Sequence, residues 1–151
     1  MHPNSKFQNY GNKGIFRNMM QDFNLNRKGR NLRKYCSDEG DRLQVAVFFI
    51  CSIPTDMRKG REGLVTIVCE YFHRDSLAYD EAFVFYNMKY DTVKILHYDL
   101  NGYVIYQKWF DDGKMLKPKF MEIKSCHLIT REQVTLLVSN AVQSKMYIYD
   151  E

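Results

Sequence analysis

A short stretch of the chain, IPTDMRKGREGL, brings three positively charged side chains close together: Arg58, Lys59 and Arg61. A proline and a threonine precede them and predict a turn, with Asp56 as the N-cap of a helix that starts directly afterwards. The first turn of a helix carries free backbone N–H groups and positive charge, so cations placed there oppose the helix dipole and favour a bound anion. A DNA phosphate or an acidic partner surface would fill such a site. Neutralisation by Asp56 and Glu62 is the alternative, and the sequence leaves both open.

Basic and aromatic side chains also alternate along TVKILHYD, LNG and YVIYQKWF. Asn-Gly between two β-rich runs predicts a tight hairpin, because both residues tolerate the positive φ that such turns require. Interleaving of this kind is typical of sheets that bind single-stranded nucleic acid, and its members here are Lys94, Tyr98, Tyr103, Tyr106, Lys108 and Trp109. Aromatic residues in strands are more often part of a core than a platform for bases. We expect one face of the hairpin to pack against a core, and the pattern does not decide which face.

Carboxylates are numerous enough to raise the question of a metal-dependent nuclease, which needs three of them converging on two metal ions about 4 Å apart. The candidates are Asp56, Asp80, Glu81, Asp91, Asp99, Asp111 and Asp112. Several of them lie at predicted turns or at the predicted helix cap, where acids are common for conformational reasons. The four cysteines stand far apart from one another, with no C-x-x-C pair, and the four histidines are likewise scattered. We therefore expect no catalytic residue, no metal, no cofactor, and cysteines that are reduced thiols.

The N-terminal part of the chain is strongly basic. Residues 1–34 hold eight lysines and arginines against one acid, which gives this segment a net charge of +7 in a chain whose total is +4. Residues 1–43 lack sustained periodicity, so we expect a largely irregular arm, whose candidate phosphate contacts are Arg27, Lys28 and Arg30. A solvated tail that aids solubility is an equal alternative. Within the arm, the spacing of four apolar side chains predicts a short amphipathic helix: Phe16, Met19, Met20 and Phe23.

The cationic stretch lies between a predicted strand and a predicted helix. QVAVFFICSI is β-branched, aromatic and ended by a proline, and it predicts a buried strand. One helical face then runs to about Phe72 and consists of Leu64, Ile67, Val68 and Tyr71. Gly60 and Gly63 lie on or beside this face, so they predict a helix backbone packed closely against another element.

The remaining elements complete a single domain. AFVFYN predicts a second strand, the hairpin follows, and Asp111 to Gly113 form the next turn. KMLKP is a short extended piece that Pro118 prevents from continuing as a central strand. In SCHLITREQVTLLVSNAV, Thr130 and Gln133 fit a capping box ahead of an apolar helix, with room for a short strand before it.

The predicted fold class is α+β, with a mainly antiparallel sheet that includes a long hairpin. One helix follows the first strand and one lies near the C-terminus, and the basic arm precedes them. With 151 residues in total, we expect one α+β domain over residues 44–151 after the arm of residues 1–43. The longest apolar run, Val45 to Cys51, is too short to span a bilayer, which needs about 20 residues, so we expect a cytoplasmic protein without a membrane segment.

Four segments of this chain also resemble a known family: PTDMRKGREGL, FVFYN, VKILHYDLNGYVIYQKWFDDGKMLKP and LITREQVTLLV. In this order and at similar spacing they are similar to the TnpB (Orf2-like) accessory-protein family of insertion-sequence-66 transposable elements. The similarity covers about residues 45 to 142. At the strand–helix junction the family pattern corresponds to Asp56, Met57, Arg58, Gly60, Gly63 and Leu64. In the hairpin it corresponds to Lys94, Asp99, Gly102, Tyr103, Lys108 and Gly113.

The resemblance implies a bacterial, non-catalytic accessory protein that is required for transposition alongside a separate transposase. Its expected partners are DNA at the element ends, the transposase and the other accessory protein of the same element. The expected nucleic-acid or anion contacts are Arg58, Lys59, Arg61, Lys94 and Lys108, together with the three cations of the arm. A module that only bridges proteins is the first alternative, and a metal-dependent nuclease is the second.

Three positions depart from the family pattern. Relatives usually carry an arginine-rich loop after the second strand, whereas this chain has NMKYDT with Lys89 as its only cation. They commonly have tryptophan at the position of Tyr98, and a basic residue at the position of Trp109. The loop and the Trp109 position therefore carry less positive charge than in relatives.

Overall fold

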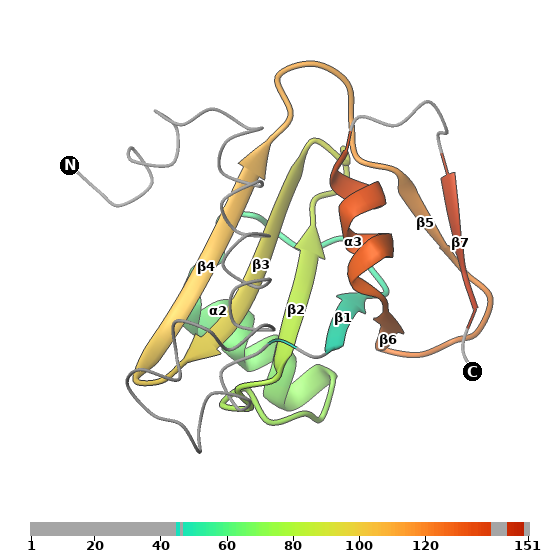
Figure 1. The fold of residues 1–151 in the computed structure, drawn as a ribbon. Helices are drawn as coiled ribbons and strands as arrows, with labels where there is room; N and C mark the ends of the chain where they lie inside the picture. Colours follow the sequence, from blue (N-terminus) through green and yellow to red (C-terminus); the bar gives the residue numbers. More distant parts are fainter. Residues whose placement is uncertain (1–44, 46, 140–144, 150–151) are drawn as a thin grey trace.

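The computed structural model describes Val45, residues 47–139 and residues 145–149 of the chain. In this part, five strands form one sheet in the order β4-β3-β2-β1-β6, and β5 and β7 form a separate pair beside it (Figure 1). The strands are β1 (Val47–Cys51), β2 (Glu81–Tyr86), β3 (Thr92–Asp99), β4 (Gly102–Trp109), β5 (Lys117–Phe120), β6 (Cys126–Ile129) and β7 (Lys145–Ile148). The helical segments are α2 (Arg61–Thr66), the π-helix η3 (Ile67–Tyr71) and α3 (Arg131–Val138). The predicted α+β class is confirmed.

Most strand pairs in the large sheet are antiparallel, as predicted. β6 pairs with β1, β2 with β3, and β3 with β4 in this manner. The exception is β1, which runs parallel to β2. A parallel pair needs a crossover connection between its strands, and the segment α2–η3 supplies it.

Strands β1, β2 and β3 carry core residues on both faces, so the prediction of a single buried hairpin face is wrong. One face carries Phe48, Val84 and Ile95 against Val134 and Leu137 of α3. The opposite face packs against α2–η3, and its core consists of Cys51, Leu64, Val68, Phe72, Phe83, Phe85 and Leu96. In Figure 1, α3 lies in front of the sheet and α2 behind it. The physical reason for the error is that β3 is a central strand covered on both sides, and its first six residues are all buried.

The helix after β1 starts later than predicted. Its N-cap is Gly60, without a side-chain cap, so the prediction of Asp56 as N-cap is wrong. Asp56 instead accepts a hydrogen bond from the backbone N–H of Arg58, which closes an Asx turn before the helix. The helical run ends in η3 at Tyr71, with Phe72 as its C-cap, close to the predicted end.

The two glycines of this segment do not bring the helix close to the sheet. A Cβ atom on Gly60 would have no atom within 4 Å, so no close approach requires a glycine there. A Cβ on Gly63 would come within 3.0 Å of the Lys59 side chain. The predicted packing role is therefore wrong for both, and Gly63 makes room for a lysine of its own segment.

The hairpin of β3 and β4 is confirmed, but its turn is one residue earlier than predicted. Asp99 pairs with Gly102, so the two-residue loop is Leu100 and Asn101. Leu100 takes the positive φ of 54°, and Gly102 belongs to β4 without a positive φ. The following turn does need a glycine, because Gly113 has a φ of 82°.

The C-terminal elements largely agree with the sequence pattern. Thr130 and Gln133 form the predicted capping box of α3, and β6 is the short strand before it. Pro118 lies inside β5, which stays out of the large sheet. β7 was not predicted. The predicted arm of residues 1–43 and the amphipathic helix predicted within it lie outside the described residues, and the proposed domain boundary stays a prediction. No helix in the described part is long and apolar enough to cross a membrane.

Candidate nucleic-acid interface

The turn between β1 and α2 presents Arg58 on the surface. Its guanidinium folds back onto Asp56, with Nε donating to both carboxylate oxygens and Nη2 donating to Oδ2 at 2.8 Å. These hydrogen bonds lower the pKa of Asp56 to about 2. The Arg58 side chain nevertheless stays 91% exposed, so one side of the guanidinium is tied to the acid while the rest faces solvent.

Lys59 and Arg61 complete the cationic junction, as we name the segment of residues 58–61. Both residues are exposed. The stem of Lys59 lies against Gly63, and Arg61 approaches its neighbour Glu62 at 3.6 Å. Such exposed pairs contribute little energy and are easily exchanged for another partner. The structure thus leaves all three predicted cations exposed within four consecutive residues.

Lys94 lies beneath the junction rather than on its surface. The residue is 7% exposed, and its Nζ donates a hydrogen bond of 2.7 Å to the backbone carbonyl of Lys59. Burial lowers the pKa of its ammonium group. Lys94, which was predicted to contact an anion, therefore supports the backbone of the junction from the interior of the fold.

Lys108 lies on the opposite face of the sheet. Its Cα partner is Val93, whereas Lys94 pairs with Gln107. The ammonium of Lys108 donates to the backbone carbonyl of Val138 at the end of α3, 2.6 Å away, and lies over the ring of Phe110. A cation at a helix C-terminus complements the helix dipole. The structure does not bring Lys108 together with the cationic junction.

The aromatic residues of the hairpin do not form one continuous row. Tyr98 and Tyr103 face each other across the strands with an edge-to-face contact of 5.0 Å at the turn end. The Tyr103 hydroxyl is 2.8 Å from the Ser76 hydroxyl, which ties the hairpin to the loop before β2. Tyr106 packs against the α3-side core. Trp109 lies at the other end of the hairpin, opposite Thr92, which is the end near the cationic junction.

The other family-motif residues lie in the core or in the hairpin turn rather than on the exposed junction. Leu64 is fully buried under the sheet, and Met57 packs against the same core. Asp99 and Gly102 form the last pair of the hairpin. These positions shape the junction and the hairpin around it.

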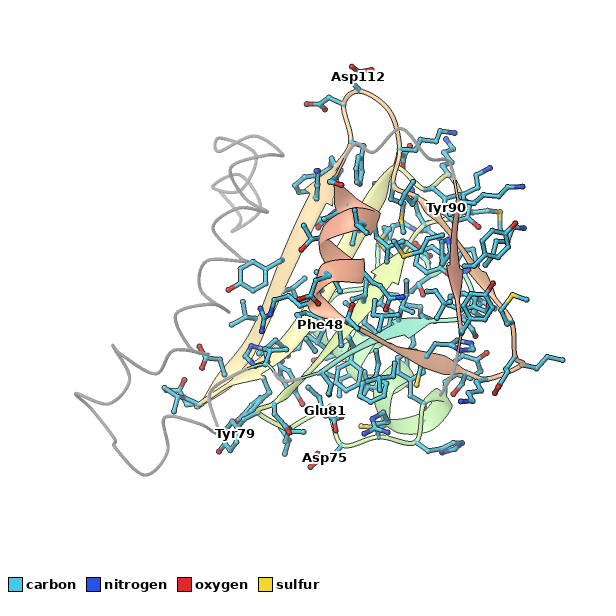
Figure 2. All side chains as sticks on the ribbon, turned by 45° about the vertical axis from the view of Figure 1, so that its right-hand side comes forward. Phe48, Asp75, Tyr79, Glu81, Tyr90 and Asp112 are labelled. Atoms are coloured by element: carbon cyan, nitrogen blue, oxygen red, sulfur yellow. The ribbon has the colours of Figure 1, made fainter. Side chains whose placement is uncertain are left out.

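A pocket of about 790 Å³ opens next to the cationic junction. It lies beyond the carboxyl ends of the parallel strands β1 and β2, where open α/β sheets commonly bind ligands. Figure 2 shows Tyr90 and Asp112 at this end of the sheet, and Tyr79 and Glu81 at the opposite end. The lining comes from residues 54–58, residues 87–89, Asp91, Thr92, Gln107 and Trp109. We name it the strand-end pocket.

Two pocket residues were missed as candidates by the sequence analysis. Gln107 was not singled out although it lies on the same face as Lys94, and Asn87 was not considered. The alternating pattern of β4 predicts which side of the strand Gln107 lies on. It does not predict that Gln107 is buried, because the loops that cover it are distant in the chain. Asn87 holds the β2–β3 loop, because its side-chain oxygen accepts from the backbone N–H groups of Asp91 and Thr92.

The candidate carboxylates are spread over the molecule. Asp56 binds Arg58, and Asp91 accepts hydrogen bonds from Asn87 and Thr92. Glu81 makes a two-pronged ion pair with Arg74, at 2.8 Å and 3.0 Å. Within the described ranges, no three His, Cys, Asp or Glu side chains are grouped so that they could hold a metal ion. Arg27, Lys28 and Arg30 fall outside those ranges.

The comparisons with known proteins identify a family. A family model described as IS66 Orf2-like protein matches residues 45–146, which is more than half of the chain. The match confirms the resemblance found in the sequence and contains both the cationic junction and the strand-end pocket. Searches against curated proteins and against solved structures returned no match.

Proposed function

Because this chain belongs to the IS66 Orf2-like family, we propose that it is a non-catalytic accessory protein for transposition, and that it contacts DNA through the cationic junction. Family membership places the protein with the transposition of an insertion sequence. The observation that carries the DNA contact is the group of exposed cations held in place from inside the fold.

The electrostatics of the junction favour a phosphate. Three cations at residues 58, 59 and 61 face two acids, Asp56 and Glu62, so the segment keeps an excess positive charge. Lys94 adds another positive charge directly beneath. Since nucleic-acid affinity comes largely from neutralised phosphates, exposed cations on a fixed loop are suited to contact a DNA backbone.

The fixed backbone of the junction adds to this argument. The Asx turn of Asp56 and the hydrogen bond from Lys94 to the Lys59 carbonyl restrain the loop at both sides of Arg58. Ordering a loop on binding costs free energy, and a loop that is already ordered avoids much of that cost. The basic residues of the N-terminal segment would add further phosphate contacts through their charge.

A salt titration with two matched double variants tests this function. We expect fluorescence anisotropy with element-end DNA to show an affinity that falls steeply with ionic strength. Lys59→Ala with Arg61→Ala should weaken binding and reduce the salt slope by about two. The control is Lys114→Ala with Lys119→Ala, which removes the same charge from exposed positions elsewhere and should leave the slope nearly unchanged. Absence of salt-sensitive affinity, or equal effects of the two pairs, would refute the DNA contact.

A second candidate function is a module that bridges the transposase and the other accessory protein. The loop between β5 and β6 favours it, because Met121 and Ile123 are 54% and 105% exposed there, and Leu128 on the edge strand β6 is 54% exposed. Exposed apolar groups of this kind are typical of protein interfaces. Retention of purified transposase by the Lys59→Ala, Arg61→Ala protein, together with its loss in Met121→Ser, Ile123→Ser, would support bridging.

A further inference from the structure

We propose that the strand-end pocket binds a single unpaired nucleobase of DNA, with Gln107 hydrogen-bonding to the edge of the base and Trp109 stacking on its face. The proposal deepens the DNA contact proposed above and rests on it. It adds a ligand, a base outside the double helix, and two residues that the cationic junction does not include.

The first observation is the state of the Gln107 side chain. The residue is 8% exposed and lines the pocket. Its amide makes no hydrogen bond with any residue in the part of the chain that the structure describes. An amide that lines a pocket and has no partner within the protein can exchange hydrogen bonds with a ligand or a water. Gln107 therefore supplies a donor and an acceptor that a ligand can use.

The second observation is the position of Trp109. It follows Gln107 by two residues on β4, so both side chains leave the same face of the sheet about 7 Å apart along the strand. A nucleobase has apolar faces and a polar edge. Aromatic side chains stack on the faces of unpaired bases, and a glutamine amide can make two hydrogen bonds to the edge of adenine. Gln107 can therefore bind the polar edge of a base while Trp109 stacks on the apolar face of the same base.

The third observation is the charge around the opening. Arg58 and Lys89 line the pocket together with two acids, Asp56 and Asp91. Both acids already accept hydrogen bonds, Asp56 from Arg58 and Asp91 from Asn87 and Thr92. Lys89 and the solvent-facing side of the Arg58 guanidinium can accompany the phosphate that enters with a nucleotide, while the balanced total charge leaves selectivity to the base. The exposed side chain of Met88 adds an apolar surface at the rim.

The size of the pocket agrees with a small ligand. Its volume of about 790 Å³ lies within the usual range of ligand sites, roughly 300–1,000 Å³. Its position beyond the ends of two parallel strands also places it beside the cationic junction, since residues 54–58 belong to both. A strand whose backbone lies along the junction could thus insert one base into the pocket.

Trp109 provides the readout, because it is the only tryptophan in the chain. We expect single-stranded oligodeoxynucleotides to quench its fluorescence, and an abasic oligonucleotide of equal length and charge to leave it unchanged. Among homopolymers, oligo-dA should bind most tightly. Gln107→Leu should weaken oligo-dA binding about tenfold and leave binding of the abasic strand unchanged. A melting temperature close to that of the native protein would show that the variant is folded.

The outcomes separate this proposal from the DNA contact of the junction. Salt-sensitive binding that is equal for normal and abasic strands, without quenching and without an effect of Gln107→Leu, would overturn the pocket proposal and leave the junction contact standing. If the native protein bound no DNA at all, both the junction contact and the pocket proposal would be overturned. Quenching by transposase-derived peptides but not by oligonucleotides would assign the pocket to a peptide and overturn the nucleobase.

Discussion

The ammonium group of Lys94 and the backbone carbonyl oxygen of Lys59 lie 2.7 Å apart, and this contact connects the interior of the sheet to an exposed loop. Lys94 is nearly completely buried, whereas Lys59 is exposed. A buried lysine is unfavourable unless its charge is compensated by hydrogen bonds. The carbonyl of Lys59 supplies one such bond, so the conformation of the loop and the tolerance of a buried charge depend on each other.

Lys94→Met should loosen the junction without unfolding the protein. Methionine keeps most of the apolar stem, and removing a buried charge offsets the lost hydrogen bond, so the free energy of unfolding should change by less than about 1 kcal/mol. Hydrogen exchange should show about tenfold lower protection of the backbone amides of Lys59 and Leu64, which bond to Asp56 and Gly60. Lys108→Met is the control, because its hydrogen bond lies on the other face. Unchanged protection in Lys94→Met would contradict the positioning role.

The same lysine predicts a dependence of stability on pH. Burial lowers the pKa of Lys94 in the folded protein below its ordinary value of 10.5. Between the lowered value and 10.5, the unfolded chain binds more protons than the folded one, so the contribution of Lys94 makes stability rise with pH. Urea denaturation at a series of alkaline pH values should show this rise in the native protein relative to Lys94→Met. A difference that falls with increasing pH would contradict the assignment.

Asp56→Asn should strengthen DNA binding by releasing Arg58. Asparagine can still accept the hydrogen bond from the Arg58 backbone N–H, so the Asx turn should remain. The freed guanidinium should add about one phosphate contact and make the salt slope steeper by about 0.9. Asp75→Asn is a matched control, because Asp75 also closes an Asx turn, with Leu77, and lies at the opposite end of the sheet (Figure 2). Equal salt slopes for the two variants would contradict the contact of Arg58.

The pKa of Asp56 sets the pH below which the Asp56–Arg58 ion pair is lost. It lies at about 2, below its ordinary value of 3.8, because Arg58 hydrogen-bonds to the ionised form. The stability that the pair contributes is fully present above pH 4 and is lost as the pH falls through about 2. An NMR titration of the Asp56 carboxyl carbon should show this midpoint in the native protein. In Arg58→Ala the midpoint should return towards 3.8.

Gly102→Ala should be tolerated even though the residue belongs to an Asn-Gly pair. Gly102 has no positive φ, and an added Cβ would have no atom within 4 Å. Restricting the unfolded chain should then raise the free energy of unfolding by about 0.4–1 kcal/mol. Gly113→Ala is the contrasting case, because its φ of 82° strains any side chain, and it should lose more than about 1 kcal/mol. Thermal denaturation measures the stability of both variants. A Gly102→Ala protein less stable than Gly113→Ala would contradict our assignment of the turn.

Thr130→Ala should destabilise α3. The Thr130 hydroxyl accepts from the backbone N–H of Gln133, and the Gln133 side chain accepts from the backbone of Thr130. Loss of such a cap costs about 1 kcal/mol, measurable by urea denaturation. Thr135→Ala is the control, since its hydroxyl only bonds to the carbonyl of Arg131 on an exposed helix face, and it should change stability by less than about 0.5 kcal/mol.

The parts of the fold that the sequence predicts correctly have strong local signals. β1 is a continuous apolar run, β3 and β4 are long β-rich runs around a turn, and α3 begins with a capping box. β7 has only four residues and exists through its pairing with β5, which no local pattern records. The parallel pairing of β1 with β2 also depends on distant residues, although a strand–helix–strand order is the usual setting for it.

The errors at the candidate site arise from competing local motifs. An aspartate before a helical pattern predicts an N-cap, but the Asx turn of Asp56 uses the same oxygen earlier in the chain. The three cations that the sequence pattern singled out, Arg58, Lys59 and Arg61, are all exposed, and their role as contacts stays a prediction. The burial of Lys94 and Gln107 could not be predicted in the same way, because residues from two loops and the sheet together enclose them.

The position of β1 between β2 and β6 has a consequence for synthesis of the chain. β1 leaves the ribosome first among the strands of the large sheet, and its partner β6 leaves last. Until residues 126–129 emerge, one edge of VFFIC keeps its backbone groups unpaired, and such apolar edges recruit strands from other molecules. A message that ends before Cys126 therefore encodes an aggregating product rather than a smaller folded protein.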